Sequence, residues 1–346
     1  MSNNFKKKYM SILKNKFILT ISFLVLLLSV SKDNDLDRIS VRSNDFVNEK
    51  GETIVFRGYN TSDPDKLEKQ GHWNKPYLEE VKKWGANIVR FPVHPTAWTE
   101  RGKENYLKLL DDGIKWATDL NMHVIIDWHS IGNLKTEMYQ SDNYDTTKKQ
   151  TFDFWRTIAS RYGKNKTVAF YELFNEPTTY NEILGTVTWE DWKVLNEEMI
   201  TIIRANGGEG IPLVAGFNWA YDLTPVLENP INAEGIAYVS HPYPQKREKP
   251  WEEQWTKDWG FVKEKYPLIL TEIGFCGPED PGAHIPVISD ESYGDAITNY
   301  CDDKEISYVV WVFDGEWAPR LFENWETYKP SRHGKYFKKK LQSYKY

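Results

Sequence analysis

Eight short runs of apolar and β-branched residues recur along the chain, separated by longer segments. The runs are residues 53–60, 86–93, 122–129, 167–176, 211–218, 235–243, 267–274 and 306–313. Apolar residues recur at spacings of three and four in the intervening segments, such as 105–121, 151–163, 191–207 and 252–266. Strands that alternate with helices predict parallel pairing through right-handed crossovers.

Eight strand–helix units are the number that closes a (β/α)8 barrel, whose strands are buried on both faces and are nearly continuous apolar runs. The alternative, an open doubly wound sheet, is expected to carry a glycine-rich phosphate loop after an early strand. The sequence contains no G-x-G-x-x-G. We therefore predict an α/β fold of the TIM-barrel class, with residues 32–346 as a single domain.

The first 31 residues differ from the rest of the chain. A lysine-rich start without acids precedes an apolar run of fourteen residues, 17–30, and an acidic stretch follows it. This order is typical of a signal peptide. An uncleaved anchor is the alternative, but the run is shorter than the roughly 20 residues of a membrane-spanning helix. We predict a protein that is secreted, at the cell surface or periplasmic.

The amino-acid composition argues against a nucleic-acid partner and is compatible with a carbohydrate partner. The net charge is -6 with acids and bases interspersed, which gives no basic surface for nucleic acid. Fifteen Trp and twenty Tyr suit both core packing and stacking on sugar rings. In an exported chain Cys276 and Cys301 could form a disulfide, and their spacing leaves open whether they meet.

Functional groups of such a barrel lie at the carboxyl ends of its strands. Any one polar residue there can be merely solvated, but several strands end on the same kinds of group. These residues are Arg90, Asp127-Trp128-His129, Asn175-Glu176, Asn218-Trp219, His241-Pro242-Tyr243, Glu272 and Trp311.

Two carboxylates stand out among them. Glu176 closes the fourth run and Glu272 lies in the seventh, each beside apolar residues that predict partial burial. Hydrolysis of a glycosidic bond needs one carboxyl that gives a proton and a second that stays ionised. The alternative is a pair of salt bridges at the barrel mouth.

Six motifs in order along the chain resemble glycoside hydrolase family 5, the cellulase and β-mannanase family. They are NIVRFPV with Arg90, IIDWH ending at His129, FNEP with Asn175 and Glu176, HPY with His241 and Tyr243, LTEIG with Glu272 and VVWVF with Trp311. The resemblance covers about residues 45–340.

The resemblance implies that Glu176 is the general acid/base and Glu272 the nucleophile of a retaining double displacement. Charge from Arg90 and a hydrogen bond from Tyr243 would keep Glu272 ionised. Asn175 would bind the sugar 2-hydroxyl.

The remaining residues would shape the cleft. His129 and His241 would line the subsite where the bond is cleaved, and Trp311 would be the stacking floor. Trp219 could be a further sugar platform or a simple loop residue. His94 could touch substrate, but we expect it to make local hydrogen bonds, and we expect His123 to be structural. Some other loop tryptophans could extend the cleft, from among Trp73, Trp98, Trp251 and Trp317.

We therefore predict an exported retaining endo-β-1,4-glucanase. The alternatives are a β-mannanase or another plant-polysaccharide hydrolase and, in a different class, a non-catalytic carbohydrate-binding barrel. The predicted partner is a β-linked polysaccharide bound by a monomer, without a membrane partner after export. We predict no cofactor and no metal, because H-E-x-x-H, paired C-x-x-C and acidic calcium-loop motifs are missing.

Overall fold

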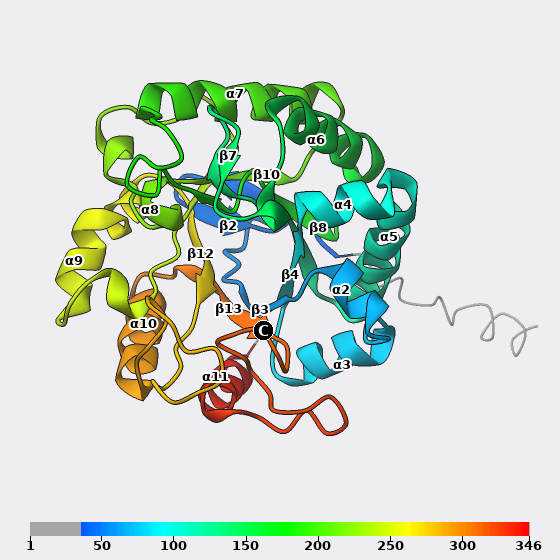
Figure 1. Cartoon of the computed structure of the whole chain (residues 1–346), viewed down its shortest axis with the longest axis vertical. Helices are drawn as coiled ribbons and strands as arrows, with labels where there is room; N and C mark the ends of the chain where they lie inside the picture. The colour runs from blue at the N-terminus through cyan, green and yellow to red at the C-terminus, as the bar shows by residue number, and fades with distance from the viewer. Residues whose placement is uncertain (1–35, 346) are drawn as a thin grey trace, which may run out of the picture. The chain divides into compact units, whose positions relative to one another are not determined.

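Eight parallel strands close into a barrel with helices around it (Figure 1). The computed structural model describes residues 36–345. In chain order the barrel strands are β3 (Arg57–Thr61), β4 (Ile88–Val93), β5 (His123–Trp128), β8 (Val168–Glu172), β10 (Ile211–Ala215), β11 (Ala237–Val239), β12 (Leu268–Ile273) and β13 (Ser307–Phe313). Each strand pairs with the next, and β13 pairs with β3. The predicted (β/α)8 barrel is confirmed.

Amphipathic helices cover the outside of the barrel. They are α2 (Pro64–Lys69), α3 (Lys75–Lys83), α4 (Pro95–Arg101), α5 (Lys103–Asp119), α6 (Lys148–Tyr162), α7 (Trp189–Ala205), α9 (Trp251–Asp258), α10 (Glu291–Asp303) and α11 (Arg332–Gln342). Side-chain caps fix several starts, as at α7, where Thr188 and Asp191 form a reciprocal capping box. The predicted segment 252–266 divides into α9 and a 3-10 helix, η4 (Gly260–Glu264).

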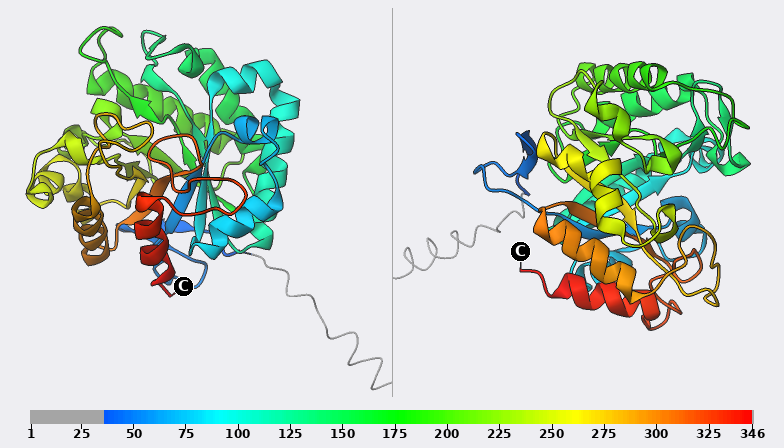
Figure 2. Two further views of the ribbon diagram at one scale, coloured as in Figure 1. Left: turned by 60° about the horizontal axis from the view of Figure 1, so that its bottom comes forward. Right: turned by 90° about the vertical axis from the view of Figure 1, so that its left-hand side faces the viewer.

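The amino-terminal end of the barrel is apolar and closed. A hairpin of β1 (Ser40–Arg42) and β2 (Asp45–Val47) packs there, away from the loops that follow the strands (Figure 2). The ring of Phe46 lies 5.0 Å from that of Phe170 and 6.0 Å from that of Phe56. Apolar rings thus fill this end of the barrel, whereas functional groups of such a fold lie at the opposite, carboxyl end.

A small sheet at the barrel mouth corrects one predicted boundary. The run 167–176 is not one strand: β8 ends at Glu172, and Glu176 lies in β9 (Glu176–Pro177). There it pairs with β6 (Ile131–Asn133), which also pairs with β7 (Met138–Tyr139). After Glu172 the backbone still bonds two barrel strands, through Leu173 N to Leu213 O and Asn175 N to Trp128 O, before Glu176 and Thr178 bond to the segment of β6. Glu176 thus lies four residues beyond the end of β8.

Both cysteine thiols are free and buried. Burial raises the pKa of Cys276 to about 11 and that of Cys301 to about 12. The possibility of a disulfide between them, left open by the sequence, is not realised in this structure.

The predicted signal peptide, residues 1–31, lies outside the described residues. Within residues 36–345, every helix is too short or too polar to cross a bilayer.

A backbone contact between the first two barrel strands allows no side chain. A Cβ on Gly58 would lie 1.9 Å from the carbonyl oxygen of Ile88. Gly58→Ala is therefore expected to lower the free energy of unfolding by about 3 kcal/mol or more, measured by urea denaturation. Gly71→Ala is the control, because no atom lies within 4 Å of its Cβ position and only its positive φ resists alanine, at about 1 kcal/mol. Equal losses in the two variants would contradict the contact argument.

Candidate active site

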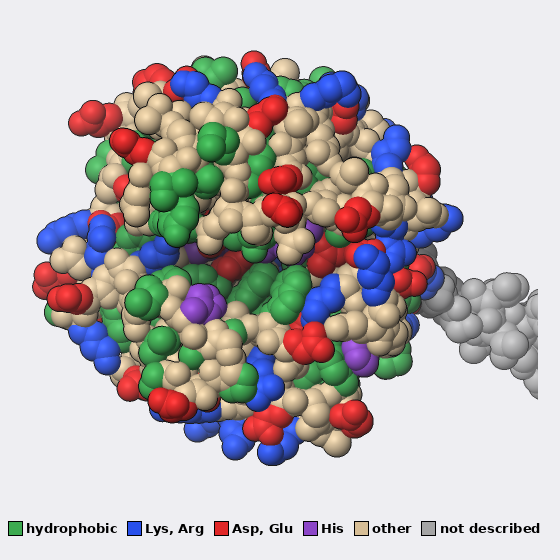
Figure 3. All heavy atoms as spheres, in the orientation of Figure 1, with side chains coloured by type: hydrophobic (Ala, Val, Ile, Leu, Met, Phe, Trp, Pro, Cys, Tyr) green, Lys and Arg blue, Asp and Glu red, His purple; other side chains and the backbone are tan. Residues whose placement is uncertain are grey.

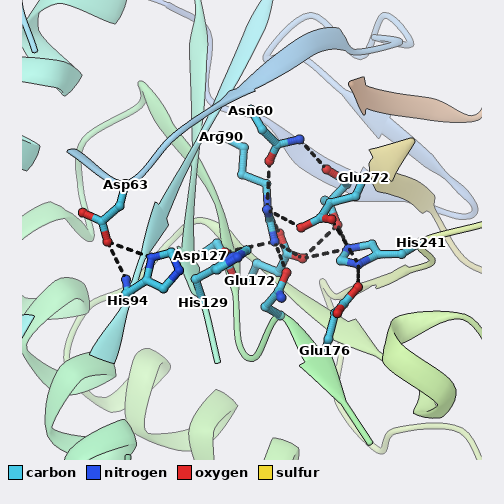
Figure 4. Close-up of polar contacts among 12 residues, drawn as sticks. Asn60, Asp63, Arg90, His94, Asp127, His129, Glu172, Glu176, His241 and Glu272 are labelled. Atoms are coloured by element: carbon cyan, nitrogen blue, oxygen red, sulfur yellow. Dashed lines mark hydrogen bonds and ion pairs between the residues drawn. The ribbon is translucent and has the colours of Figure 1, made fainter. Parts of the chain in front are cut away.

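A cavity of about 1010 Å³ opens at the carboxyl end of the barrel. Figure 3 shows acidic, histidine and apolar side chains inside the hollow at the centre of this face. Most of the predicted site residues line it: His129, Asn175, Glu176, Trp219, Tyr243, Glu272 and Trp311. Arg90 and His241 are fully buried and do not line it. The prediction that His241 lines the cleavage subsite is therefore wrong, because its ring is fully buried between the two glutamates (Figure 4).

Arg90 on β4 is the central cation of the site. Its Nε and Nη2 donate to both oxygens of Glu172, at 2.6 and 3.0 Å. Its Nη1 donates to Glu272 Oε1 at 3.1 Å, and its Nη2 lies 3.0 Å from Asp127 Oδ2. Burial opposes the charge on Arg90, but Asp127, Glu172 and Glu272 outweigh it and raise its pKa. Arg90 is therefore a cation in this site.

Glu272 on β12 is held between two donors at the edge of the cavity. Its Oε1 accepts from Arg90, and its Oε2 accepts from the Tyr243 hydroxyl at 2.8 Å. Burial raises the pKa of Glu272, whereas the charges of His241 and Arg90 act to lower it. Arg90 and Tyr243 thus contact Glu272 in the way their predicted roles require.

His241, just after β11, links the two glutamates. Its Nδ1 lies 3.0 Å from Glu176 Oε1 and 3.9 Å from Glu272 Oε2. Burial acts to lower the pKa of His241, but the charges of Glu272, Glu172 and Glu176 outweigh it and raise this pKa to about 9. The imidazole is accordingly an imidazolium at neutral pH.

The two glutamates are close together. One carboxylate oxygen of Glu176 and one of Glu272 lie within 4.8 Å of each other, and a ring nitrogen of His241 is within the same limit of both. Retaining glycosidases have carboxyl groups about 5–5.5 Å apart, whereas inverting ones need about 6.5–9.5 Å to admit a water. Oxygens within 4.8 Å of each other are compatible with the shorter of these two separations.

Aromatic rings form the walls of the cavity. Trp311 lies parallel to His129, with ring centres 5.4 Å apart, and to Trp317, at 6.1 Å. On another wall Trp219 donates from Nε1 to Gln140 Oε1 at 2.8 Å. Trp219 and Trp317 both line the cavity. Of the other loop tryptophans considered from the sequence, three are buried in the core instead: Trp73, Trp98 and Trp251.

Of the two histidines outside the motifs that were considered from the sequence, one lines the cavity and the other is buried. His94 lines the cavity, and its Nδ1 lies 2.9 Å from Oδ2 of Asp63, 31 residues earlier. The prediction of purely local hydrogen bonds for His94 is therefore wrong, because the fold brings the buried Asp63 beneath it. His123 is structural as predicted, since it is buried and its Nε2 contacts the carbonyl of Asp37 at 3.0 Å.

Sequence reasoning missed the fully buried polar layer beneath the cavity. Glu172 lies within the apolar run of β8, four residues before Glu176, and a charge inside such a run was the available signal. Asn60 accepts from Arg90 Nη1 at 2.8 Å, and Thr271 donates to Glu172 Oε1 at 2.8 Å. Neither Asn60 nor Thr271 carries a charge that would distinguish it in the sequence.

Comparison with known proteins identifies the family. The model of the cellulase family, glycosyl hydrolase family 5, matches residues 47–316, most of the chain. The chain belongs to glycosyl hydrolase family 5. All six motifs that carried the resemblance fall inside this match.

Solved structures and curated proteins of similar sequence include several glucanases. A family 5 β-glucanase of Saccharophagus degradans, crystallised with cellotetraose, is 47% identical with a TM-score of 0.87, over 89% of this chain and 93% of that one. Endoglucanase A of Butyrivibrio fibrisolvens is 28% identical over 257 residues, 71% of this chain and 54% of that protein. An endoglucanase of Clostridium saccharobutylicum is 32% identical over 171 residues, 46% of this chain and 33% of that protein. The family 5 chain thus spans about half or less of the length of these two curated relatives.

The buried imidazolium predicts a pH dependence of stability. Because the pKa of His241 rises from 6.5 to about 9 on folding, its contribution is fully present below pH 6.5 and is lost as pH rises through about 9. The loss corresponds to about 3 kcal/mol of unfolding free energy.

Urea denaturation at pH 6.5 and pH 9.5 measures this loss. His241→Asn should remove the decline that wild type shows, whereas the exposed His284→Asn should keep it. A decline of equal size in His241→Asn and wild type would assign it to other groups.

Proposed function

We propose that the protein is a retaining endo-β-1,4-glucanase. The observation that carries the proposal is the pair of glutamates, Glu176 and Glu272, with oxygens within 4.8 Å of each other at the edge of an aromatic-walled cavity. Their surroundings differ, as a double displacement requires. Glu272 is held by Arg90 and Tyr243, whereas Glu176 contacts His241.

Each glutamate has a step in this reaction. Glu272 attacks the anomeric carbon while Glu176 protonates the departing glycosidic oxygen, which leaves a glycosyl ester on Glu272. Water then attacks the same carbon, Glu176 takes the proton of that water, and Glu272 departs as a carboxylate. The donors from Arg90 and Tyr243 stabilise the carboxylate form of Glu272 before and after the ester exists.

Asn175 and Trp311 support the sugar at the cleavage point. The Oδ1 of Asn175 accepts from Arg90 at 2.7 Å, which fixes the amide with its Nδ2 without a protein partner among the described residues. Because Asn175 also lines the cavity, this Nδ2 is a donor for the sugar 2-hydroxyl oxygen. Trp311 offers an indole face for the apolar face of the ring.

The β-1,4-glucan substrate is supported by the cavity and by similarity. Tryptophans 219, 311 and 317 line a cavity of about 1010 Å³ and provide stacking surfaces for several sugar units. The 47% identical β-glucanase of Saccharophagus degradans was crystallised with cellotetraose. Glucan is accordingly the substrate class that we propose for this chain.

Substitution of each glutamate tests its role. Glu272→Gln should reduce glucan hydrolysis to the detection limit, because an amide cannot form the ester. Glu176→Gln should slow glucan hydrolysis by about 10²–10⁴-fold and yet still release a first equivalent of dinitrophenol from 2,4-dinitrophenyl β-cellobioside, whose leaving group needs no proton. The control is Glu182→Gln, on the exposed loop nearby. Wild-type rates in Glu272→Gln would refute the nucleophile assignment.

Product analysis tests the stereochemistry and the substrate. Proton NMR of the first product should show the β-anomer, and an α-anomer would exclude the double displacement. In a panel of cellulose derivatives, mixed-linkage glucan, mannan, xylan and xyloglucan, reducing ends should appear fastest with a β-1,4-linked glucan. Faster release from mannan would make the protein a β-mannanase. A protein that binds these polymers and cleaves none would be a non-catalytic binding barrel.

Export and independence from metals complete the proposal. The lysine-rich start and apolar run of residues 1–31 support secretion, and an intact leader on the cytosolic protein of the native host would contradict it. Cleavage of a glycosidic bond by two carboxylates needs no metal. Dialysis against EDTA should accordingly leave the rate of glucan hydrolysis unchanged. We propose that the enzyme acts as a monomer.

A further inference from the structure

Lys246 is a cation in the wall of the cavity. It ends η3 (Pro244–Lys246), and it lines the cavity together with Asn218 and Trp219 of α8 (Phe217–Ala220). Its Nζ donates to the carbonyl oxygen of Asn218 at 2.9 Å and lies 4.8 Å from the ring centre of Trp219. Because an ammonium group can donate three hydrogen bonds, two donors of Lys246 remain for a ligand after this bond.

Lys66 and Lys246 both lie over a tryptophan of the cavity, but they differ in their counter-charges. Nζ of Lys66 lies 5.0 Å from the ring centre of Trp317. Its charge is balanced by Asp314 Oδ2 at 2.6 Å and by Glu316 Oε2 at 3.1 Å. Among residues 36–345, by contrast, no carboxylate forms an ion pair with Lys246.

Burial makes this uncompensated charge costly. The side chain of Lys246 is half-buried, and burial lowers its pKa to about 8, whereas the charge of Glu176 acts to raise it. The amine is still mostly a cation at neutral pH. A cation that has lost part of its hydration gains free energy when an anion binds beside it. Lys246 supplies a single positive charge, and Glu176 and Glu272 in the same cavity repel further negative charge, so a monoanionic carboxylate fits better than a phosphate dianion.

The backbone turn next to Lys246 is an unusual one. Asn218, Trp219 and Ala220 have φ angles of 57°, 55° and 56°, in the left-handed region that residues other than glycine seldom adopt. Such a turn persists only where its surroundings hold it. Trp219 donates to Gln140, and Lys246 donates to the carbonyl of Asn218. Lys246 thus supports the turn, and an experiment on its charge has to separate this support from recognition of a ligand.

The wall that holds Lys246 lies on the side of the leaving sugar. Gln140, which accepts from Trp219 Nε1, bonds through its backbone to β6, and β6 pairs with Glu176 in the small sheet. This wall is thus joined to the strand of the proposed proton donor, whereas Trp311 belongs to another wall. The proton donor of a glycosidase faces the departing glycosidic oxygen. The sugar unit that follows the cleaved bond therefore lies toward Lys246.

We propose that Lys246 confers a preference for β-glucans that carry a carboxylate, as a glucuronate or a carboxymethyl group, on the sugar unit after the cleaved bond. The inference rests on the proposed glucanase function and names a substrate class for it. The two remaining donors of Lys246 bind the carboxylate oxygens through charge-assisted hydrogen bonds, which are stronger than bonds to a neutral hydroxyl. Neutral glucans remain substrates, because cleavage itself uses Glu176 and Glu272.

Kinetics on two soluble glucans test the inference. For each enzyme, kcat/KM on carboxymethyl cellulose is divided by kcat/KM on hydroxyethyl cellulose at pH 6 and low salt, where Lys246 is a cation. Lys246→Gln keeps a donor and removes the charge, so its ratio should fall about 3–10-fold below that of wild type, whereas Lys246→Arg should keep the wild-type ratio. Added salt should lower the ratio more in wild type than in Lys246→Gln.

Lys249→Gln is the matched control. Lys249 follows on the same loop, lies 4.8 Å from the ring centre of Trp251 and donates to Ser292, but it does not line the cavity. Its substitution should leave the ratio at the wild-type value. If Lys246 only supports the turn at Asn218, Lys246→Gln would slow hydrolysis of both polymers equally, and an unchanged ratio would overturn the inference. An equal fall in Lys249→Gln would overturn it too, because the effect would then come from general surface charge.

The position of the carboxylate is tested by the products. Mass spectrometry of the oligosaccharides from carboxymethyl cellulose should find substituted units at the new non-reducing ends more often with wild type than with Lys246→Gln. An equal frequency with the two enzymes would overturn the assignment of the carboxylate to the sugar after the cleaved bond.

Binding of two disaccharides gives a readout that does not depend on hydrolysis. In NMR titrations wild type should bind cellobiouronic acid about 3–10-fold more tightly than cellobiose, and Lys246→Gln should bind the two about equally. Equal binding by wild type would overturn the inference and leave the glucanase proposal intact. Hydrolysis of neither polymer, together with a preference for the acid that Lys246→Gln loses, would refute the glucanase and uphold the carboxylate site.

Discussion

The buried guanidinium of Arg90 is the interaction on which the rest of the site depends. One cation on β4 contacts acids from three other barrel strands, Asp127, Glu172 and Glu272. Buried carboxylates without a counter-charge would be expelled or protonated, because low-dielectric surroundings penalise an unpaired charge. Only a closed barrel brings four strands to one side chain in this way. The charge balance of the site therefore depends on closure of the barrel.

The barrel separates two environments along its axis. Phe46, Phe56 and Phe170 close one end with apolar rings, so the interior polar groups collect at the other end. There, two departures from regular strand geometry set the position of the glutamates. The register of β12 shifts at the stretch that carries Glu272. Glu176 lies in β9, beyond the end of β8, where it pairs with β6.

Much of this arrangement could be predicted from residue patterns. The eight runs are apolar because parallel strands are buried on both faces, and each barrel strand lies within or overlaps its predicted run. Both glutamates, Arg90, Asn175 and Tyr243 could be named from strand ends and motifs, because groups at that end of a barrel converge whatever the details of packing.

The depth of each side chain could not be predicted. Trp317 lines the cavity and Trp98 is buried in the core, although both are loop or helix-start tryptophans in the sequence. His241 is fully buried against Glu176, and the single charge of Glu172 in an apolar run has no evident role until the fold places Arg90 beside it.

The sequence by itself determined the barrel, its polar end and the identity of the reacting groups, because these depend on local periodicity and residue chemistry. Tertiary structure alone decided which groups touch. Protonation of His241 and the pairing of Glu272 depend on contacts between residues 29 to 182 positions apart, which no local pattern encodes.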